Sequence, residues 1–268
     1  ERTMLHSDNA YFLPHVEINA RVCRTNFPPN TAFRGFGGPQ GMAAIAHVMQ
    51  EVAIARGEDA YAVRRRNLYG KEERNVTPYG QTVGGNLLPD ILDRLYESSD
   101  YASRLAEVES FNKTSRTRLR GLALTPMKFG ISFTTKFLNQ GNALVNIYAD
   151  GTVQVSTGAT EMGQGVNTKI QQLVADEFGI GIEQVRVMAT STEKNNNTSP
   201  TAASASTDLN GAAAINACWQ IRERMAKFAA ELFTDEKKGI TRSAEHVRFR
   251  DGHVLDVRTP ERKIPFGD

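Results

Sequence analysis

A glycine-rich stretch that runs directly into a helical pattern constrains this chain more than any other feature. It covers residues 31–41 and reads Thr-Ala-Phe-Arg-Gly-Phe-Gly-Gly-Pro-Gln-Gly. Glycine allows unusual backbone conformations and close approach of a ligand, and Pro39 suits the first turn of a helix. The N–H groups and dipole at such a helix start favour an anion. The stretch predicts either a loop that holds a flat anionic molecule or a tight turn whose Phe33 and Phe36 enter the core.

The same arrangement, a loop of small residues followed by a helix start, recurs at 163–165 and at 199–206. Each helix start leaves backbone N–H groups unpaired. The third loop keeps a low surface through its alanines and adds two hydroxyl groups through Ser204 and Ser206. If the three starts converge, they form a cradle for a large polar anion. If they do not, they are ordinary helix starts.

Composition narrows the class of protein. The chain has 268 residues, 40% of them hydrophobic, which is ordinary globular composition for one large or two medium domains. Its net charge of +2 is too small to indicate a surface that binds nucleic acid or a membrane. No apolar run approaches the length of a membrane span. Cys23 and Cys218 form no disulfide framework, and the histidines show no metal-ligand spacing. We predict a cytoplasmic protein with no nucleic-acid or membrane partner.

The chain begins at Glu1 without an initiator methionine or a signal peptide, and its last residues form no obvious terminal element. We therefore expect an internal piece of a longer polypeptide.

The apolar periodicity predicts helices before residue 112 and a mixture of strands and helices after it. In the first part we expect a strand over 12–27, helices over 39–56, 58–66, 87–98 and 101–111, and a loop over 71–86. In the second we expect strands over 119–125, 143–149, 152–156 and 185–189, a helix over 166–178, a long helix that Ser199 and Pro200 begin and that ends near 233, and a final hairpin over 247–257. The fold class is α+β, with mixed or antiparallel sheets and packed helices in two subdomains, 1–112 and 113–268, that share a cofactor cleft.

Four blocks of this sequence, in the same order, resemble the molybdenum-binding part of the xanthine dehydrogenase/aldehyde oxidase family. They are AFRGFGGPQ at 32–40, GISFT at 130–134, TEMGQG at 160–165 and NTSPTAASAS at 197–206. The resemblance covers essentially the whole chain. It implies that 1–112 ends a first molybdopterin-binding subdomain and that 113–268 begins a second.

The activity that the resemblance implies is that of a molybdenum hydroxylase. Such an enzyme holds molybdopterin, whose molybdenum has no protein side-chain ligand, and hydroxylates a purine or aldehyde carbon with oxygen from water. Two electrons pass to 2Fe-2S clusters and FAD in other parts of a dimeric parent enzyme. We expect xanthine or hypoxanthine as the substrate. The alternatives are an aldehyde oxidase-type hydroxylase and a noncatalytic scaffold or ligand-binding module that kept the fold.

The resemblance also implies roles for individual residues. The cofactor would contact Phe33 and Arg34 near the metal, and Gly163, Gln164, Ala202, Ala203, Ser204 and Ser206 around the pterin and its phosphate. The substrate would contact Phe36, Phe133, Thr134 and Arg2. Two aromatic rings suit a planar heterocycle, one stacked on it and one edge-on. A guanidinium at a purine oxygen stabilises the charge that develops there, which favours a purine over an aldehyde.

Some of the family's functional residues lie outside this sequence. The catalytic base is a glutamate in a later glycine-rich segment, and a second substrate-pairing glutamate and a glutamine beside the metal come from sequence ahead of Glu1. Glu161 matches a family position without a catalytic role, so we interpret it as structural. Because hydroxylation needs a base within hydrogen-bond reach, we expect this chain alone to be inactive and to bind cofactor poorly.

Overall fold

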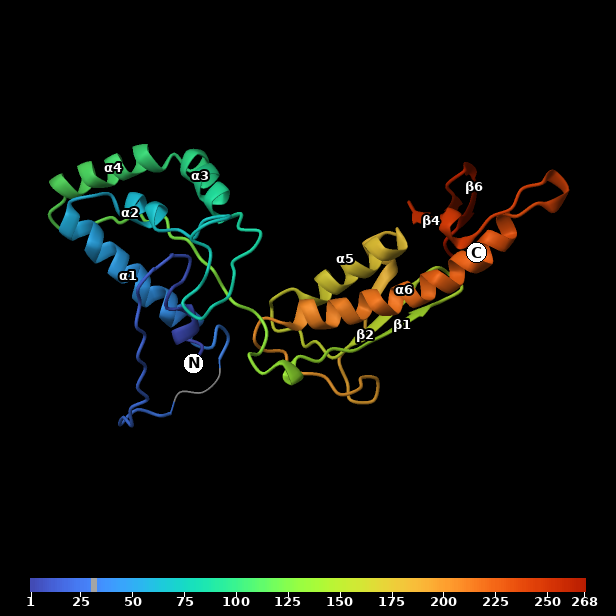
Figure 1. Cartoon of the computed structure of the whole chain (residues 1–268), viewed down its shortest axis with the longest axis horizontal. Coiled ribbons are helices and arrows are strands. Elements are labelled where there is room, and N and C mark those ends of the chain that lie inside the picture. Colours follow the sequence, from blue (N-terminus) through green and yellow to red (C-terminus); the bar gives the residue numbers. More distant parts are fainter. Residues whose placement is uncertain (30–32) are drawn as a thin grey trace. The chain divides into compact units, whose positions relative to one another are not determined.

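The computed structural model describes residues 1–29 and 33–268, and the chain divides into two compact units (Figure 1). Unit 1 runs from Glu1 to Gly130 and unit 2 from Ile131 to Asp268. Thr31 and Ala32, which open the glycine-rich stretch, lie outside the described residues.

Unit 1 is built from helices. They are η1 (Met4–His6), α1 (Gly38–Arg56), α2 (Ala60–Arg66), α3 (Leu88–Ser98) and α4 (Tyr101–Thr114). Helix α1 ends at Gly57, whose φ of 63° is left-handed, and Asp59 caps α2 by accepting the N–H of Ala62 at 3.1 Å. The four predicted helices of this part are therefore confirmed, with small shifts at their ends.

Two strands predicted from alternating residues are wrong: the described residues of 12–27 and of 119–125 form no strand. A strand needs a partner for its backbone groups, and along 119–125 side chains take that place. The carbonyl of Leu124 accepts from Arg64 Nη1 at 3.4 Å, and Asn112 exchanges hydrogen bonds with the backbone of Arg120. Leu122 and Leu124 pack on the core of unit 1.

The boundary between the units also differs from the prediction. The sequence placed it near residue 112, whereas the compact units divide between Gly130 and Ile131. The segment after α4 belongs to unit 1 because it packs on that core and because Asn9 Nδ2 donates to the carbonyl of Pro126 at 3.0 Å.

Unit 2 contains two three-stranded sheets and two long helices. Its strands are β1 (Ala143–Ile147), β2 (Val153–Thr157), β3 (Val185–Val187), β4 (Val247–Arg250), β5 (His253–Asp256) and β6 (Thr259–Pro265). Its α-helices are α5 (Val166–Phe178) and α6 (Ser206–Phe233), and its short 3-10 turns are η2 (Lys136–Leu138), η3 (Ile182–Gln184), η4 (Glu236–Lys238) and η5 (Ala244–His246).

The pairing in unit 2 follows the turns. The pair β1 and β2 is antiparallel around Asp150 and Gly151, whose φ is 78°, while β3 returns parallel to β2 after the α5 crossover. The second sheet is an antiparallel meander in which β6 follows the predicted β4–β5 hairpin. Strand β6 was not predicted: three consecutive charged residues stand at its centre, with a proline near each end, so it has no apolar alternation. The α+β fold class is confirmed.

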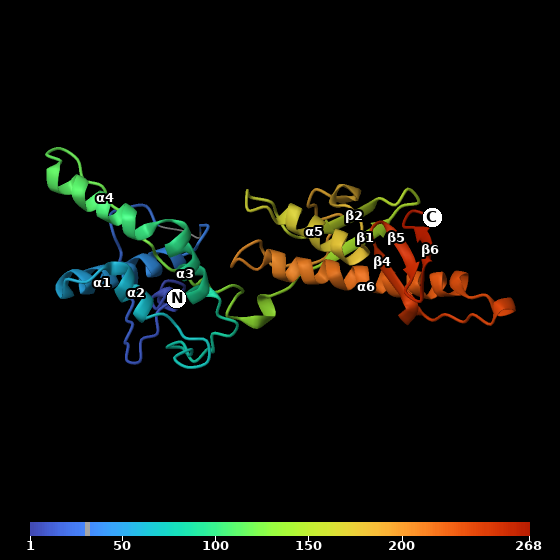
Figure 2. The same ribbon diagram turned by 90° about the horizontal axis from the view of Figure 1, so that it is seen from above.

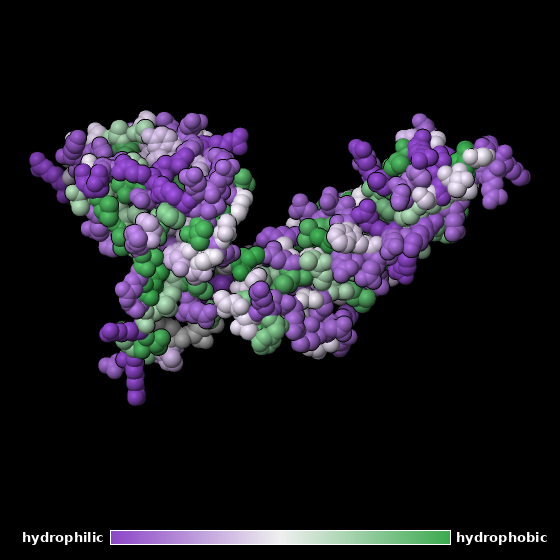
Figure 3. Space-filling view, in the orientation of Figure 1, coloured by the Kyte–Doolittle hydropathy of each residue, from purple (hydrophilic) through white to green (hydrophobic). Residues whose placement is uncertain are grey.

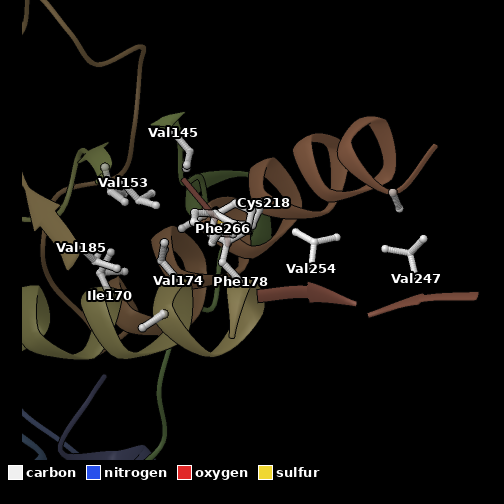
Figure 4. Packing of buried hydrophobic residues seen from close by; sticks show 14 of the residues in the cluster. Val145, Val153, Ile170, Val174, Phe178, Val185, Cys218, Val247, Val254 and Phe266 are labelled. Carbon is white, nitrogen blue, oxygen red and sulfur yellow. The ribbon is translucent and has the colours of Figure 1, made fainter. Parts of the chain in front are cut away.

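The core of unit 2 lies between the first sheet and the helices (Figure 4). Val153 and Val155 of the central strand β2 are fully buried, and the apolar face of α5, with Ile170, Val174 and Phe178, packs into the same cluster. Helix α5 runs beside α6, and both views show that the two helices begin at the same end of unit 2 (Figures 1 and 2). This packing brings two of the three predicted loop-to-helix starts together.

The surface of each unit carries apolar residues among the polar ones (Figure 3). In the described part of the chain, every helix is too short or too polar to cross a lipid bilayer.

Candidate functional site

The glycine-rich stretch of unit 1 forms two successive tight turns before α1. The N–H of Phe36 donates to the carbonyl of Phe33 at 2.8 Å, and that of Gly38 donates to the carbonyl of Gly35 at 2.9 Å. Phe33 is 83% exposed and Phe36 57% exposed. The alternative in which both rings enter the core of this unit is therefore wrong, and the rings, with the exposed Arg34, are accessible on unit 1.

The glycines of this stretch are required by protein contacts as well as by backbone conformation. Gly35 and Gly37 have φ values of 89° and 93°. A Cβ at Gly37 would lie 2.6 Å from Thr3 Oγ1, and one at Gly38 would lie 2.5 Å from the Phe129 ring. A Cβ at Gly41 would meet the carbonyl oxygen of Thr3. These glycines let α1 begin directly against η1, so they bring protein segments together at places where the sequence suggested a ligand.

Arg2 lies in this same contact region of unit 1. Its Nη2 donates to the carbonyl of Gly130 at 2.7 Å, and its guanidinium carbon lies 5.2 Å from the centroid of the Phe129 ring. A Cβ at Gly37 would be 3.6 Å from the Cβ of Arg2. Unit 1 thus places the predicted substrate arginine beside the turn that carries Phe36.

Buried His6 holds this region together. The sequence shows no metal-ligand spacing among the histidines and predicts no particular contact for His6. Its Nδ1 lies 2.8 Å from the carbonyl oxygen of Arg2, and its Nε2 accepts the N–H of Gly130 at 2.9 Å. Burial lowers the pKa of the ring, which favours the neutral form. A lone histidine between Leu5 and Ser7 carries no pattern from which these contacts could be predicted.

In unit 2, hydrogen bonds join three of the four family-like blocks. The N–H of Ser132 donates to the carbonyl of Ala203 at 2.8 Å, and the N–H of Thr160 donates to Thr201 Oγ1 at 2.8 Å. The loops of 131–134, 160–165 and 197–206 therefore form one surface of this unit.

Two residues that the sequence did not single out shape this surface. Asn139 accepts the N–H of Phe133 and donates to its carbonyl, both at 2.9 Å, and so fixes the backbone of the half-buried Phe133 beside the exposed Thr134. The backbone carbonyl of Gln140 accepts the N–H of Ser199 and the hydroxyl of Thr198, at 3.1 Å each. The only signal in the sequence for these roles was that two residues with hydrogen-bonding side chains follow a predicted binding loop.

The start of α5 is already occupied by a carboxylate of the chain itself. Glu161 Oε1 accepts the N–H groups of Gly163 and Gly165 at 2.9 Å each, and its Oε2 accepts that of Asn167 at 3.1 Å. These backbone hydrogen bonds lower the pKa of the Glu161 carboxyl. The expectation that this start offers unpaired N–H groups is wrong for Gly163, Gly165 and Asn167, because a local carboxylate sits at the positive end of the helix.

Gln164 is engaged in the same loop. Its Nε2 donates to the carbonyl of Thr160 at 2.8 Å, and its Oε1 accepts the N–H of Met162. Gly163 and Gly165 have φ values of 85° and 75°, and within the described chain no atom lies within 4 Å of a Cβ built at either glycine. The loop is internally fixed and presents an open backbone surface.

The start of α6 differs from the prediction. The helix begins at Ser206 after Ala205, and Ser199 instead accepts the N–H of Gln140 at 2.9 Å. In the described residues, α6 has no side-chain cap at Ala205, so its first-turn N–H groups keep the capacity to bind an anion. Just before it, Ala203 and Ser204 both have a φ of 54°, a conformation that alanine and serine adopt rarely.

A groove in unit 2 lies between β1 and α6 and is lined in part by Asn142, Asn216, Gln220 and Arg224. None of the predicted site residues lines this groove.

Comparison with known proteins identifies the class to which this fold and these loops belong. The chain is a member of the molybdopterin cofactor-binding domain family, whose models match residues 1–68 and 94–266. Its relatives include xanthine dehydrogenase of Dictyostelium discoideum, 48% identical over 84% of this chain, and xanthine dehydrogenase/oxidase of Mus musculus, 48% identical over 85% of it. The matched part spans 16% of the first relative and 17% of the second.

Solved structures confirm the fold. Quinoline 2-oxidoreductase from Pseudomonas putida 86 matches 88% of this chain with a TM-score of 0.68 and 25% identity. CO dehydrogenase from Oligotropha carboxidovorans matches 88% with a TM-score of 0.73 and 21% identity. The chain covers 30% of each of these chains.

The loops of unit 2 fit the cofactor of this family. Molybdopterin is a polar, phosphate-bearing group that needs backbone donors and close approach of the chain. The uncapped start of α6, the exposed Ala202 and Ser204 and the open Gly163 backbone provide both. Within this surface, the start of α6 suits the phosphate better than the start of α5, where Glu161 already lies.

Proposed function

We propose that this chain is part of a molybdenum hydroxylase that oxidises xanthine and hypoxanthine. The observation that carries the proposal is the position of Arg2 beside the turn of Phe36, in a chain nearly half identical to xanthine dehydrogenases. A cation next to an exposed aromatic ring suits a planar heterocycle that bears oxygen.

Unit 2 would hold the cofactor as the second molybdopterin-binding subdomain, with unit 1 ending the first. Ser206 and the backbone of 202–204 would bind the phosphate and pterin, and the loop of Gly163 and Gln164 would support the ring system. Phe33 and Arg34 of unit 1 would contact the metal end through their backbone. When bound, the cofactor supplies the redox centre that takes two electrons from the substrate.

Four residues would contact the substrate. Of the two predicted aromatic rings, Phe36 and Phe133, one would stack on the purine and one would lie edge-on, with Thr134 beside it. Arg2 would pair with a purine oxygen, where negative charge grows as the ring is hydroxylated. Because a guanidinium placed there binds the transition state better than the substrate, it accelerates the reaction.

The remaining parts of the enzyme would come from outside this sequence. They are the glutamate that acts as base, the 2Fe-2S clusters and the FAD, in a cytoplasmic dimer. We therefore expect the 268-residue chain alone to be inactive, and xanthine turnover by the purified chain with bound molybdenum would contradict this expectation.

The test compares xanthine with benzaldehyde in the full-length enzyme. Arg2→Met should lower kcat/KM for xanthine by about 100-fold or more and leave the benzaldehyde rate nearly unchanged. Arg21→Met, at an exposed position of the same unit, is the matched control. Oxidation of benzaldehyde but not xanthine by the unaltered enzyme would favour the aldehyde oxidase-type alternative, and oxidation of neither would favour a scaffold.

A further inference from the structure

We propose that His6 positions Arg2 for catalysis by closing a ring of hydrogen bonds through Gly130. His6 does not touch the substrate in this proposal, which rests on the function proposed for Arg2. Its role is to fix both the backbone of Arg2 and the carbonyl that the guanidinium contacts.

The ring consists of three contacts among three residues. Arg2 Nη2 donates to the carbonyl of Gly130 at 2.7 Å, the N–H of Gly130 donates to His6 Nε2 at 2.9 Å, and His6 Nδ1 meets the carbonyl of Arg2 at 2.8 Å. Because the Gly130 N–H needs an acceptor and the Arg2 carbonyl needs a donor, the imidazole of His6 must carry its proton on Nδ1. Arg2 is thus held at its backbone and at its side chain.

A neutral imidazole is the side chain that this arrangement requires. His6 is 2% exposed, and its ring lies 4.7 Å from that of Phe129. The charged groups that act on it are Arg2 and Lys128, which oppose protonation, and Asp8, which favours it. Protonation would turn Nε2 into a donor that faces the N–H of Gly130, so the ring of contacts would open.

The segment around His6 has other anchors, so removal of the imidazole need not unfold it. Asp8 accepts the hydroxyl of Tyr69 at 2.6 Å and lies 3.2 Å from Lys128 Nζ. Asn9 accepts the N–H of Lys128 at 2.9 Å and donates to Pro126. These contacts join the start of the chain to 126–130 independently of His6.

The first test observes the protonation of the His6 imidazole directly and does not depend on catalysis. Nitrogen NMR of the full chain labelled at histidine, with the His6 signals assigned by their loss in His6→Phe, should show a neutral Nδ1–H tautomer at pH 7 and a pKa below 6.5. An Nε2–H tautomer, or a His6 imidazole that is protonated at pH 7, would overturn the proposal.

The second test measures the xanthine and benzaldehyde rates of the full-length enzyme. His6→Phe keeps an aromatic ring beside Phe129 but removes both hydrogen bonds, and His6→Gln restores an acceptor. His15→Phe, at an exposed position of unit 1, is the matched control. His6→Phe should lower kcat for xanthine by about 10- to 100-fold, the scale of a misplaced catalytic group, and His6→Gln should lie between. The benzaldehyde rate should change little.

The ratio of the two rates should also depend on pH. In the unaltered enzyme it should fall in acid together with the protonation of His6 seen by NMR, and this decline should be absent in His6→Phe. Equal losses on both substrates, or a full xanthine rate in His6→Phe, would overturn the positioning role. If the tautomer is confirmed but the unaltered enzyme does not oxidise xanthine, the proposed function fails while the hydrogen-bonded ring stands.

Discussion

Gly41→Ala tests whether the start of α1 is built around contact with η1. At an open helical position this change would stabilise the helix by about 1 kcal/mol. Here a Cβ would meet the carbonyl oxygen of Thr3 and lie 3.0 Å from the carbonyl carbon of His6. Both neighbours are backbone atoms and cannot rotate away.

The net effect follows from two opposing terms. Overpacking costs about 1–3 kcal/mol, and contact with two backbone groups places this site in the upper half of that range. After the gain in helix propensity, we expect the free energy of unfolding of unit 1 to fall by about 1–2 kcal/mol. For a unit of this size the midpoint temperature should fall by about 4–8 °C.

The assay is thermal and urea unfolding followed by circular dichroism. Gly121→Ala is the matched control, because a Cβ there meets no atom of the described residues within 4 Å and its φ lies outside the left-handed region. The only tryptophan of the sequence, Trp219, reports unit 2 separately by fluorescence. A stabilised Gly41→Ala protein would refute the close contact between α1 and η1.

Three further predictions concern stability and local order. Because the pKa of His6 is lowered in the folded state, the folded state binds fewer protons than the unfolded state. The contribution of His6 to stability is therefore complete above pH 6.5 and is lost as the pH falls through the folded pKa. Urea titrations at several pH values should show this decline in the unaltered chain and not in His6→Phe. Asp59→Ala should lower the stability of unit 1 by about 1 kcal/mol through loss of the α2 cap, and an unchanged urea midpoint would contradict it. Glu161→Gln should speed hydrogen exchange at Gly165 and Asn167 but not at the far end of α5, and unchanged exchange would show that the carboxylate does not hold this helix start.

Helices with a clear apolar stripe and a glycine or acidic cap could be predicted from sequence. Helix α1 ends at Gly57, and the β1–β2 hairpin turns at Asp150 and Gly151, as their local chemistry predicts. Local preference and tertiary structure agree at these places.

The failures occurred where a distant partner decides the structure. Alternation over 12–27 suggests a strand, but strand formation depends on a partner that no local pattern reveals. Ser199 and Pro200 have the chemistry of a helix start, yet Gln140 binds Ser199 and α6 begins later.

The candidate site was predicted chiefly through its resemblance to a family, and the residues alone left two interpretations open. What the sequence could not show is which backbone donors are already used. Glu161 lies within the block of 160–165, but only the structure shows that its carboxylate binds backbone N–H groups at the start of α5. The start of α6 has no such side-chain cap. The contacts of His6 could not be predicted from the sequence because one of its partners, Gly130, lies far along the chain.

A structure of the full-length enzyme with its cofactor, solved by crystallography or electron microscopy, tests the central claim most directly. We predict that the phosphate lies at the first turn of α6, that the backbone of 202–204 and Gly163 contacts the pterin, and that Glu161 stays on the start of α5. A cofactor bound elsewhere, with these loops in contact only with solvent or unrelated protein, would contradict the account.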